Sequence, residues 1–496
     1  MSGRLWPWAA AFGVGVVAFI AARLGMLAGI GFWDTAELQT VAPLLGTAHP
    51  TGYPTYVLLG WVANVLLTPF GEPAFRMNLF AGLSIAVAAA VTVDLVRVLG
   101  RSVILGVAAG LGLALTTLVW RVGFQAEAHA LHLALTAILF RLLVAWELDR
   151  RDRTLVAATI VFGLSVGNHS LSLLLIPPIA LYVVAVEPGI LRQPRLIGAC
   201  AVALAATVVL VFLELPLRAG PFRAPLVYGH PETWDGFWYV VLAEQFRGSL
   251  LDPFGDLPGK LAALVAKTAT AFGPLAPLIP LGFLSTIALR PRYALLSGTA
   301  AGITCFFAAS YVNADIDRYY LVPVLLAWTW LALLGAAIAT VVARNLGEGR
   351  RPEPVMAVAL AAILLAPTVV DAPTRFPRID RSHDDGAARW VDMALGEMAP
   401  DAVIVSWWSY STPLWYAQLV QDRRPDIDII DDRTRLDRNL GEVSDVIDAN
   451  LPTRPVYVIR IDSAEIAALD ARYRLEFLDG PSAIGLTRVL GPRTAS

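Results

Sequence analysis

The sequence has few charged residues and almost no cysteine. Asp, Glu, Lys and Arg make up 16% of the 496 residues, and the two cysteines are Cys200 and Cys305. Both lie within apolar runs, which argues against a fold held together by disulfide bonds. The formal net charge of -2 provides neither the basic excess that is typical of nucleic-acid-binding proteins nor an acidic tail, so we expect no nucleic-acid partner.

Hydrophobic residues are abundant instead. They make up 57% of the chain, and the mean hydropathy is +0.63. This apolar excess is larger than a single soluble core requires, so the composition predicts an integral membrane protein whose partner is the lipid bilayer.

Apolar runs long enough to cross a bilayer recur along the first 371 residues. The segment 53–70 is apolar as well, but we interpret it as an interfacial helix that does not cross. The sequence then predicts about 11 transmembrane helices, the first of them retained, near 9–30, 78–99, 102–120, 130–148, 154–167, 170–186, 196–216, 262–289, 293–311, 319–342 and 354–371.

The arginines favour this count. If 53–70 does not cross, the N-terminus behind Arg4 and five arginine-containing segments face the cytoplasm, as the positive-inside rule expects. These segments are 97–101, 150–153, 192–195, 290–292 and 344–351. The first loop, 31–77, is then extracytoplasmic, in a multi-pass protein of the cell membrane. Polar clusters in 121–132, 167–170, 217–260 and 313–320 converge on the same face, which indicates one site.

The composition changes after residue 371. Short strand-like runs, "DAVIVSWW", "RPDIDIID" and "RPVYVIR", alternate with the helix-like runs "TPLWYAQLVQD" and "SAEIAALDARY". We therefore predict a helical membrane domain over 1–371 and a small soluble α/β domain over 372–496, outside the cytoplasm. The second domain has no GxGxxG motif, no P-loop and no His/Cys set with metal-site spacing, so it indicates no cofactor.

Ionisable residues follow the first apolar run directly, in "GFWDTAELQTVAPLLGTAHPTGYPTY" (31–56). Asp34 and Glu37 are three residues apart and would share one face of a helix. The same spacing fits a capping box with Asp34 as N-cap, and the two roles are compatible. His49 and Tyr53 lie in a loop that prolines make stiff, where His49 either meets a substrate or hydrogen-bonds the loop backbone.

The order of several motifs resembles a known family. The motifs "WDTAEL", "HPTGYPTY", "FRMNLFAGL", "FQAEAHALH", "GLSVGNHSLSLLLIPP", "LPLRAGPFRAPLVYGHPETW" and "DIDRYYLVPV" are similar to the protein O-mannosyltransferase-like branch of the GT-C glycosyltransferases. The animal members of that branch are transmembrane O-mannosyltransferases of the endoplasmic reticulum. The resemblance covers nearly the whole chain. It implies a GT-C fold and an inverting transfer of mannose or another hexose from a polyprenyl-phosphate carrier to a hydroxyl acceptor, such as a protein Ser/Thr or a glycan, on the outer membrane face.

The resemblance also implies that Asp34 is the catalytic acid of the first loop. A carboxylate there would accept the proton of the acceptor hydroxyl as the glycosidic bond forms. Glu37 would tune Asp34 or hold the acceptor. For the donor phosphate we expect Arg318 first and Arg218 or Arg223 second, because a guanidinium matches phosphate geometry. Each arginine could instead be held in a salt bridge.

Further residues are expected around the sugar, namely Glu127, His129, His169 and Tyr319. A divalent metal is compatible with these groups, but their spacing matches no standard motif, and we predict no metal ligand. Two other functions stay open. A transporter or flippase of a lipid-linked sugar would need polar groups deep in the spans and facing the cytoplasm, whereas a scaffold that presents the soluble domain would not need the loop acids.

Overall fold

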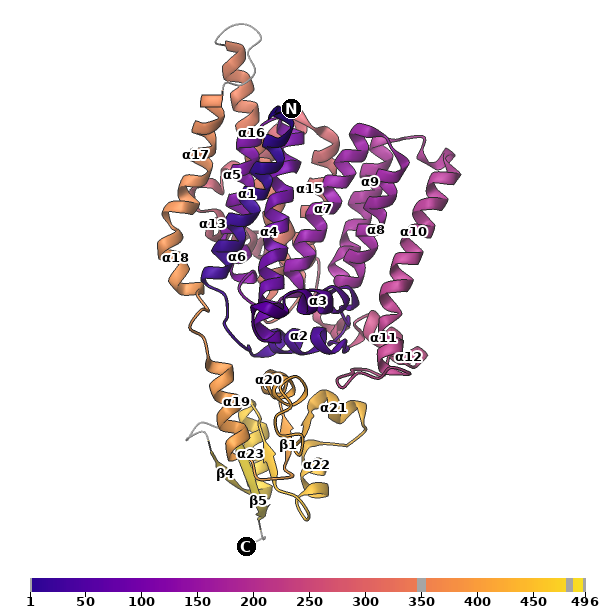
Figure 1. The fold of residues 1–496 in the computed structure, drawn as a ribbon, viewed down its shortest axis with the longest axis vertical. Helices are drawn as coiled ribbons and strands as arrows, with labels where there is room; N and C mark the ends of the chain where they lie inside the picture. Colours follow the sequence, from indigo (N-terminus) through magenta and orange to yellow (C-terminus); the bar gives the residue numbers. More distant parts are fainter. Residues whose placement is uncertain (1, 346–353, 479–484, 494–496) are drawn as a thin grey trace.

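A computed structural model describes residues 2–345, 354–478 and 485–493 of the chain. A bundle of long helices forms its larger part (Figure 1), a layer of short helices lies across one end of the bundle, and a small α/β domain lies beyond that layer. The expected cytoplasmic residues Arg350 and Arg351 fall outside the described residues.

Six of the described helical segments are long and apolar enough to cross a membrane, and two bent pairs raise the number to eight. The six are α1 (Ser2–Leu24), α4 (Pro73–Gly100), α7 (Ala128–Asp149), α10 (Pro194–Phe212) with α11 (Glu214–Ala219), α15 (Pro291–Ser310), and η6 (Ile316–Tyr320) with α16 (Leu321–Asn345). The chain is therefore a polytopic helical membrane protein, and the count of 11 spans stays a prediction.

The bent pairs are α13 (Leu257–Phe272) with α14 (Leu278–Leu289), at 82°, and α17 (Pro354–Val370) with α18 (Ala372–Ile379), at 44°. The expected span 262–289 is thus bent rather than straight. The bend follows from Gly273, whose φ is 53°, and from two neighbouring prolines, Pro274 and Pro277, which cannot donate helix hydrogen bonds.

Three expected spans are shorter helices: α5 (Val103–Leu115), α8 (Asp152–Asn168) and α9 (Ile176–Val186), the last preceded by η2 (Ser170–Leu175). Helix α6 (Thr117–Val122) follows α5. Helices α8 and α9 stand beside α7 in the bundle (Figure 1).

Helices α2 (Trp33–Leu44) and α3 (Pro54–Leu66) lie across the end of the bundle (Figure 1). At 1.5 Å per residue, α3 is only about 20 Å long, shorter than the roughly 30 Å of a bilayer core. Its first turn is buried, whereas Leu59, Trp61, Val62, Val65 and Leu66 are exposed. This arrangement agrees with the interfacial interpretation of 53–70. Helix α12 (Trp234–Val241) lies in the same layer.

Small residues let the helices around α4 approach closely. A Cβ atom added to Gly106 of α5 would lie 2.5 Å from the carbonyl oxygen of Val93, and one added to Gly110 would lie 2.7 Å from that of Ala89. Helices in lipid associate through such close packing, because lipid offers no hydrophobic driving force between them. The apolar core of the bundle is built on these contacts.

The α/β domain has a five-stranded sheet of order β2-β1-β3-β5-β4. Strand β1 pairs in parallel with β2 and β3, and β5 pairs antiparallel with β3 and β4. The elements are α19 (Gly386–Glu397), β1 (Val403–Ser406), α20 (Trp408–Leu419), β2 (Asp428–Asp431), α21 (Asp432–Asp437), α22 (Val443–Asn450), β3 (Val456–Val458), α23 (Ser463–Arg472), β4 (Tyr473–Phe477) and β5 (Thr487–Pro492).

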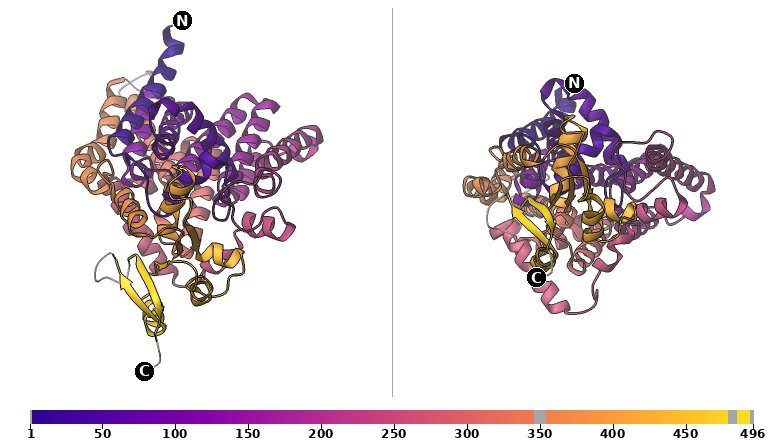
Figure 2. Two further views of the ribbon diagram at one scale, coloured as in Figure 1. Left: turned by 60° about the horizontal axis from the view of Figure 1, so that its bottom comes forward. Right: turned by 90° about the horizontal axis from the view of Figure 1, so that it is seen from below.

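Helix α20 packs on α2 and joins the sheet to the bundle. The Tyr416 hydroxyl accepts a hydrogen bond from the backbone N–H of Ala74 at 2.9 Å, and the rings of Trp33 and Trp407 meet edge to face at 4.8 Å. Figure 2 shows the α/β domain over the end of the bundle. The carboxyl ends of the parallel strands therefore face the loop that carries Asp34.

Candidate active site

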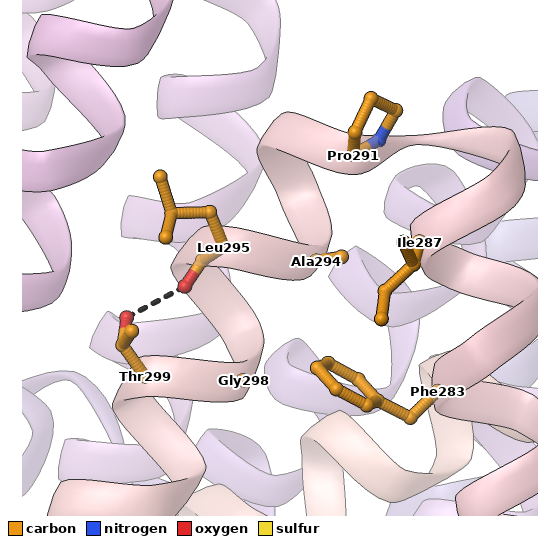
Figure 3. A pocket seen from close by; sticks show the side chains of 7 residues that line it. All are labelled: Phe283, Ile287, Pro291, Ala294, Leu295, Gly298 and Thr299. Atoms are coloured by element: carbon orange, nitrogen blue, oxygen red, sulfur yellow. Dashed lines mark hydrogen bonds between the residues drawn. The ribbon is translucent and has the colours of Figure 1, made fainter.

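A cavity of about 970 Å³ lies between the start of α2, the loop 311–320 and the carboxyl ends of β1 and β2. Asp34, His49 and Arg318 line it, and so do Arg433 and Trp408. A separate cavity of about 350 Å³ between α14 and α15 (Figure 3) is lined by Phe283, Ile287, Pro291, Ala294, Leu295, Gly298 and Thr299. That second lining contains no ionisable group, whereas the first cavity is lined by several.

Asp34 is the second residue of α2, and both of its carboxylate oxygens are engaged. Oδ2 accepts hydrogen bonds from Nη1 and Nη2 of Arg318 at 3.3 Å each, and Oδ1 accepts one from Nε1 of Trp408 at 3.4 Å. The N-cap of α2 is Phe32, and no side chain caps the helix. The expected capping box is therefore wrong, because Asp34 lies inside the helix and its carboxylate faces Arg318.

The guanidinium of Arg318 forms ion pairs with three carboxylates. Nη1 lies 2.8 Å from Oε2 of Glu127, and Nε lies 3.4 Å from Oδ2 of Asp315, in addition to the bonds to Asp34. Burial raises the pKa of Glu127, but Arg318 and His129 outweigh it and hold that pKa below its ordinary value. Arg318 is thus both salt-bridged and present in the cavity, so the two interpretations of this residue coexist.

Glu37, His49 and Tyr53 form a second chain of contacts. Nδ1 of His49 lies 2.5 Å from Oε2 of Glu37, the backbone N–H of His49 donates to Oε1 at 2.6 Å, and the Tyr53 hydroxyl lies 2.9 Å from Nε2. Burial lowers the pKa of His49, but the Glu37 carboxylate outweighs burial and raises that pKa to about 9, while burial raises the pKa of Glu37 itself. Glu37 is fully buried and does not line the cavity; its carboxylate holds His49.

His129, His169 and Tyr319 lie behind Arg318 rather than on the cavity wall. Oε1 of Glu127 accepts a hydrogen bond from the backbone N–H of His129 at 3.2 Å and lies 2.7 Å from its Nδ1. The His129 ring stacks on Tyr319 at 5.5 Å and lies 4.5 Å from His169. In the described residues, no group of three His, Cys, Asp or Glu side chains could hold a metal ion.

The structure does not bring Arg218 and Arg223 to this cavity. Arg218 donates to the carbonyl oxygens of Leu44 and Leu45 at 3.0 and 2.9 Å, which satisfies the C-terminal end of α2. Arg223 donates to the carbonyl of Ala219 at 2.7 Å and lines a smaller cavity of about 180 Å³ beside β2. Neither guanidinium contacts Asp34 or Arg318.

Asn78 holds the site together, although the sequence interpretation gave it no role. Its Oδ1 accepts hydrogen bonds from Nε2 of Gln39 at 2.9 Å and from the backbone N–H of Ala126 at 2.8 Å. Its Nδ2 donates to the carbonyl of Leu27 at 2.8 Å. One amide thereby joins the loop before α2 to the loop before α7. The signal in the sequence was a lone asparagine in the apolar motif "FRMNLF".

Two bulky residues beside the site have positive φ. Trp33, which precedes Asp34, has φ 58°, and Tyr53, which contacts His49, has φ 49°. Such a conformation costs about 1–3 kcal/mol for a residue with a side chain and persists only where surrounding contacts impose it. The edge-to-face contact of Trp33 with Trp407 and the Tyr53 hydrogen bond to His49 are such contacts.

Comparisons with known proteins find similarity both in sequence and in fold. Residues 34–188 match the family model of the protein O-mannosyl-transferase TMEM260 N-terminal domain. The chain is 31% identical over 224 residues to the protein O-mannosyl-transferase TMEM260 of Mus musculus, a match that covers 43% of this chain and 31% of the mouse protein. The matched region thus spans about a third of that relative's length. The residues matched by the family model, 34–188, include Asp34, Glu37, His49, Glu127 and His169.

The fold is similar to that of ArnT from Cupriavidus metallidurans. The crystal structure bound to undecaprenyl phosphate has a TM-score of 0.56 at 14% identity and covers 97% of this chain and 98% of that one. The apo crystal structure has a TM-score of 0.56 at 13% identity and covers 99% and 98%. The likeness includes the α/β domain, because nearly the whole of both chains is aligned.

Proposed function

We propose that the chain is a glycosyltransferase of the GT-C type that moves a sugar from a polyprenyl-phosphate carrier to a hydroxyl acceptor; the match of residues 34–188 to an O-mannosyl-transferase family model and the similarity of the fold to that of ArnT support the proposal. The observation that carries the proposal is the contact between Asp34 and Arg318 in the large cavity, at 3.3 Å. In this contact, the Asp34 carboxylate, which can accept a proton, lies beside the Arg318 guanidinium, which can hold a phosphate.

The reaction is a single displacement with inversion. The oxygen of the acceptor hydroxyl attacks the anomeric carbon, the bond from that carbon to the phosphate oxygen breaks, and the phosphate keeps the electron pair. The hydroxyl proton passes to Asp34. The two contacts that Asp34 makes, with Arg318 and Trp408, fix the direction in which its remaining lone pairs point. A fixed base needs no reorganisation during the reaction.

The ion pair couples proton transfer to departure of the phosphate. As Asp34 takes up the proton, its attraction for Arg318 falls. At the same moment the leaving phosphate gains negative charge, and a guanidinium can bind two of its oxygens. Arg318 therefore passes from one anion to the other, while Glu127 at 2.8 Å keeps it in place.

The position of the cavity suits a lipid-linked donor. It lies at the end of the membrane helices, between their loops and the α/β domain, so a phosphate can reach Arg318 while its polyprenyl tail stays in lipid. We place this end on the outer face, with the N-terminus in the cytoplasm of a cell-membrane protein. Mannose or another hexose is the proposed sugar, and the hydroxyl of a protein Ser/Thr is the proposed acceptor.

The test compares purified Asp34→Asn with the parental protein, using a panel of radiolabelled polyprenyl-phosphate sugars. An amide cannot take up the hydroxyl proton, and loss of a general base lowers a rate by roughly 10²- to 10⁴-fold. We expect a loss of this size with little change in thermal stability. Asp235→Asn, the same change on the exposed face of α12, is the matched control and should keep the parental rate.

Two outcomes contradict the proposal. Parental transfer by Asp34→Asn would remove Asp34 from the role of base. Absence of transfer from every donor by the parental protein would remove the glycosyltransferase function itself.

A further inference from the structure

The carboxyl ends of two parallel strands, β1 and β2, face the cavity. β1 leads into Trp407 and Trp408, and β2 leads into Asp431, Asp432 and Arg433, all of which line the cavity. In open α/β sheets, ligands bind outside the carboxyl ends of the strands. The α/β domain therefore presents a ligand-binding edge to the same space that Asp34 faces from the bundle.

Most charges at this edge are already paired. Asp432 accepts two hydrogen bonds from Nη1 of Arg460, at 2.9 and 3.0 Å, and Arg460 is buried below it. Asp431 caps α21 through the backbone N–H of Thr434 at 2.7 Å. These contacts are structural and leave both carboxylates occupied.

Arg433 is different. Its Nη1 donates to the Tyr239 hydroxyl at 2.7 Å, and its guanidinium lies 5.7 Å from the centre of that ring. In the described part of the chain, no carboxylate lies within ion-pair distance of Arg433, and neither Nε nor Nη2 has a hydrogen-bond acceptor. Those two nitrogens form one side of the guanidinium fork, which fits a carboxylate or a phosphate in two parallel hydrogen bonds.

The other three guanidiniums on the cavity wall are neutralised. Arg318 is bound by its three acids, Arg121 lies 3.1 Å from Asp315, and Arg381 lies 2.8 Å from Asp384. Among the described residues, Arg433 is thus the one guanidinium on this wall with no carboxylate within ion-pair distance, and its nearest acidic influence is the longer-range attraction of Asp431. An arginine side chain stays positively charged even where it is partly buried. When the protein offers it no acidic partner, its guanidinium is suited to bind an anionic group of a ligand.

We propose that Arg433 binds an acidic side chain of a peptide acceptor, close to the hydroxyl that receives the sugar. This inference rests on the proposed function and adds a preference of the acceptor site. The donor phosphate is the other possible anion, but its lipid chain ties it to the bilayer. Helix α21 lies beyond the crosswise helices, on the side away from the bundle (Figure 1). The acceptor, which comes from the aqueous side, reaches Arg433 first.

The experiment uses two threonine peptides that differ only in an Asp or an Asn two residues from the threonine. Acceptor and donor kinetics are measured separately for the parental protein, Arg433→Lys and Arg433→Gln. We expect the parental protein to favour the acidic peptide in kcat/KM by about tenfold, the ratio that one charge-assisted hydrogen bond supports. Arg433→Gln should abolish the preference, Arg433→Lys should keep part of it, and the donor KM should not change.

Arg438→Gln is the matched control. Arg438 is the C-cap residue of the same helix, but its side chain is mostly exposed and lines the smaller cavity. It should leave the peptide preference intact. Thermal stability of each variant shows whether the α/β domain remains folded.

Three outcomes would overturn the inference. In the first, the parental protein uses both peptides equally. In the second, Arg433→Gln keeps the preference for the acidic peptide. In the third, Arg433→Gln raises only the donor KM, which would assign the anion to the donor phosphate. Binding of the same two peptides, each carrying a fluorescent label and followed by fluorescence anisotropy, needs no sugar transfer. A difference between the peptides that depends on Arg433 in that assay supports the acceptor site even if no donor is found.

Discussion

At the scale of single residues, the site contains two acid–cation units with different tasks. In the first, Asp34 and Arg318 share the cavity with the substrates we propose. In the second, Glu37 is closed off by His49, and Tyr53 completes the contact. Two carboxylates three residues apart therefore have separate partners, and only Asp34 faces the cavity. The proline-containing loop between α2 and α3 places the His49 ring next to the Glu37 carboxylate.

The second unit predicts a dependence of stability on pH. His49 has a pKa of about 9 in the folded protein against the ordinary 6.5, because Glu37 holds its proton. A raised pKa stabilises the fold fully below 6.5, and the contribution disappears as the pH rises through 9. We expect the melting temperature of the parental protein to fall over this interval more steeply than that of His49→Gln.

Differential scanning fluorimetry across that interval measures the effect. His383→Gln, an exposed histidine in the described loop before α19, serves as the control and should reproduce the parental slope. Equal slopes for the parental protein and His49→Gln would mean that Glu37 does not hold the proton.

At the scale of elements, close helix contacts depend on where glycine lies. Gly112 of α5 faces Trp328 of α16, and a Cβ atom added there would lie 2.4 Å from the indole ring. Trp328 cannot retreat easily, because it is buried and its Nε1 donates to Oγ1 of Thr116 at 2.8 Å. By contrast, a Cβ atom added to Gly302 of α15 meets nothing within 4 Å.

These two glycines make a matched pair. Gly112→Ala should destabilise the bundle by about 1–3 kcal/mol, the usual cost of overpacking a core. Gly302→Ala should be neutral or slightly stabilising, since alanine is the better helix former. Thermal unfolding in detergent measures both. If the two variants melt at the same temperature, the α5–α16 contact is looser than the structure shows.

At the scale of the whole molecule, orientation in the membrane follows from the arginines rather than from the fold. The positive-inside rule places 150–153 in the cytoplasm and the layer with α2, α3 and α12 outside. We expect a single cysteine at His230 to react with an impermeant maleimide in intact cells. One at Arg151 should react only after permeabilisation. Cys200 and Cys305 are first replaced by alanine.

Both positions are exposed in the structure, so burial does not explain a failure to react. Labelling of residue 151 in intact cells would invert the topology. The cavity would then face the cytoplasm, and the outer-face reaction proposed above would have to be abandoned.

The sequence by itself determined the membrane class, the GT-C resemblance and the existence of a terminal α/β domain; the fold confirms the first and the third, and the family-model match agrees with the resemblance. These features are encoded by local patterns: apolar runs, motif order and strand-length alternation. Asp34, His49 and Arg318 were noted as unusual polar residues beside apolar runs, and the catalytic role of Asp34 was expected from the family resemblance.

Only the tertiary structure decided which groups meet. The contact between Asp34 and Arg318 joins residues 284 positions apart, and that between Asp34 and Trp408 joins residues 374 apart. No local pattern contains such pairings. A capping box and a cavity carboxylate have the same spacing, and Arg218 and Arg318 have the same chemistry. The difference arises from packing. The contact of α20 with α2 places Trp408 beside Asp34, and the segment 311–320 places Arg318 there. Arg218 instead donates its hydrogen bonds to the carbonyls at the end of α2.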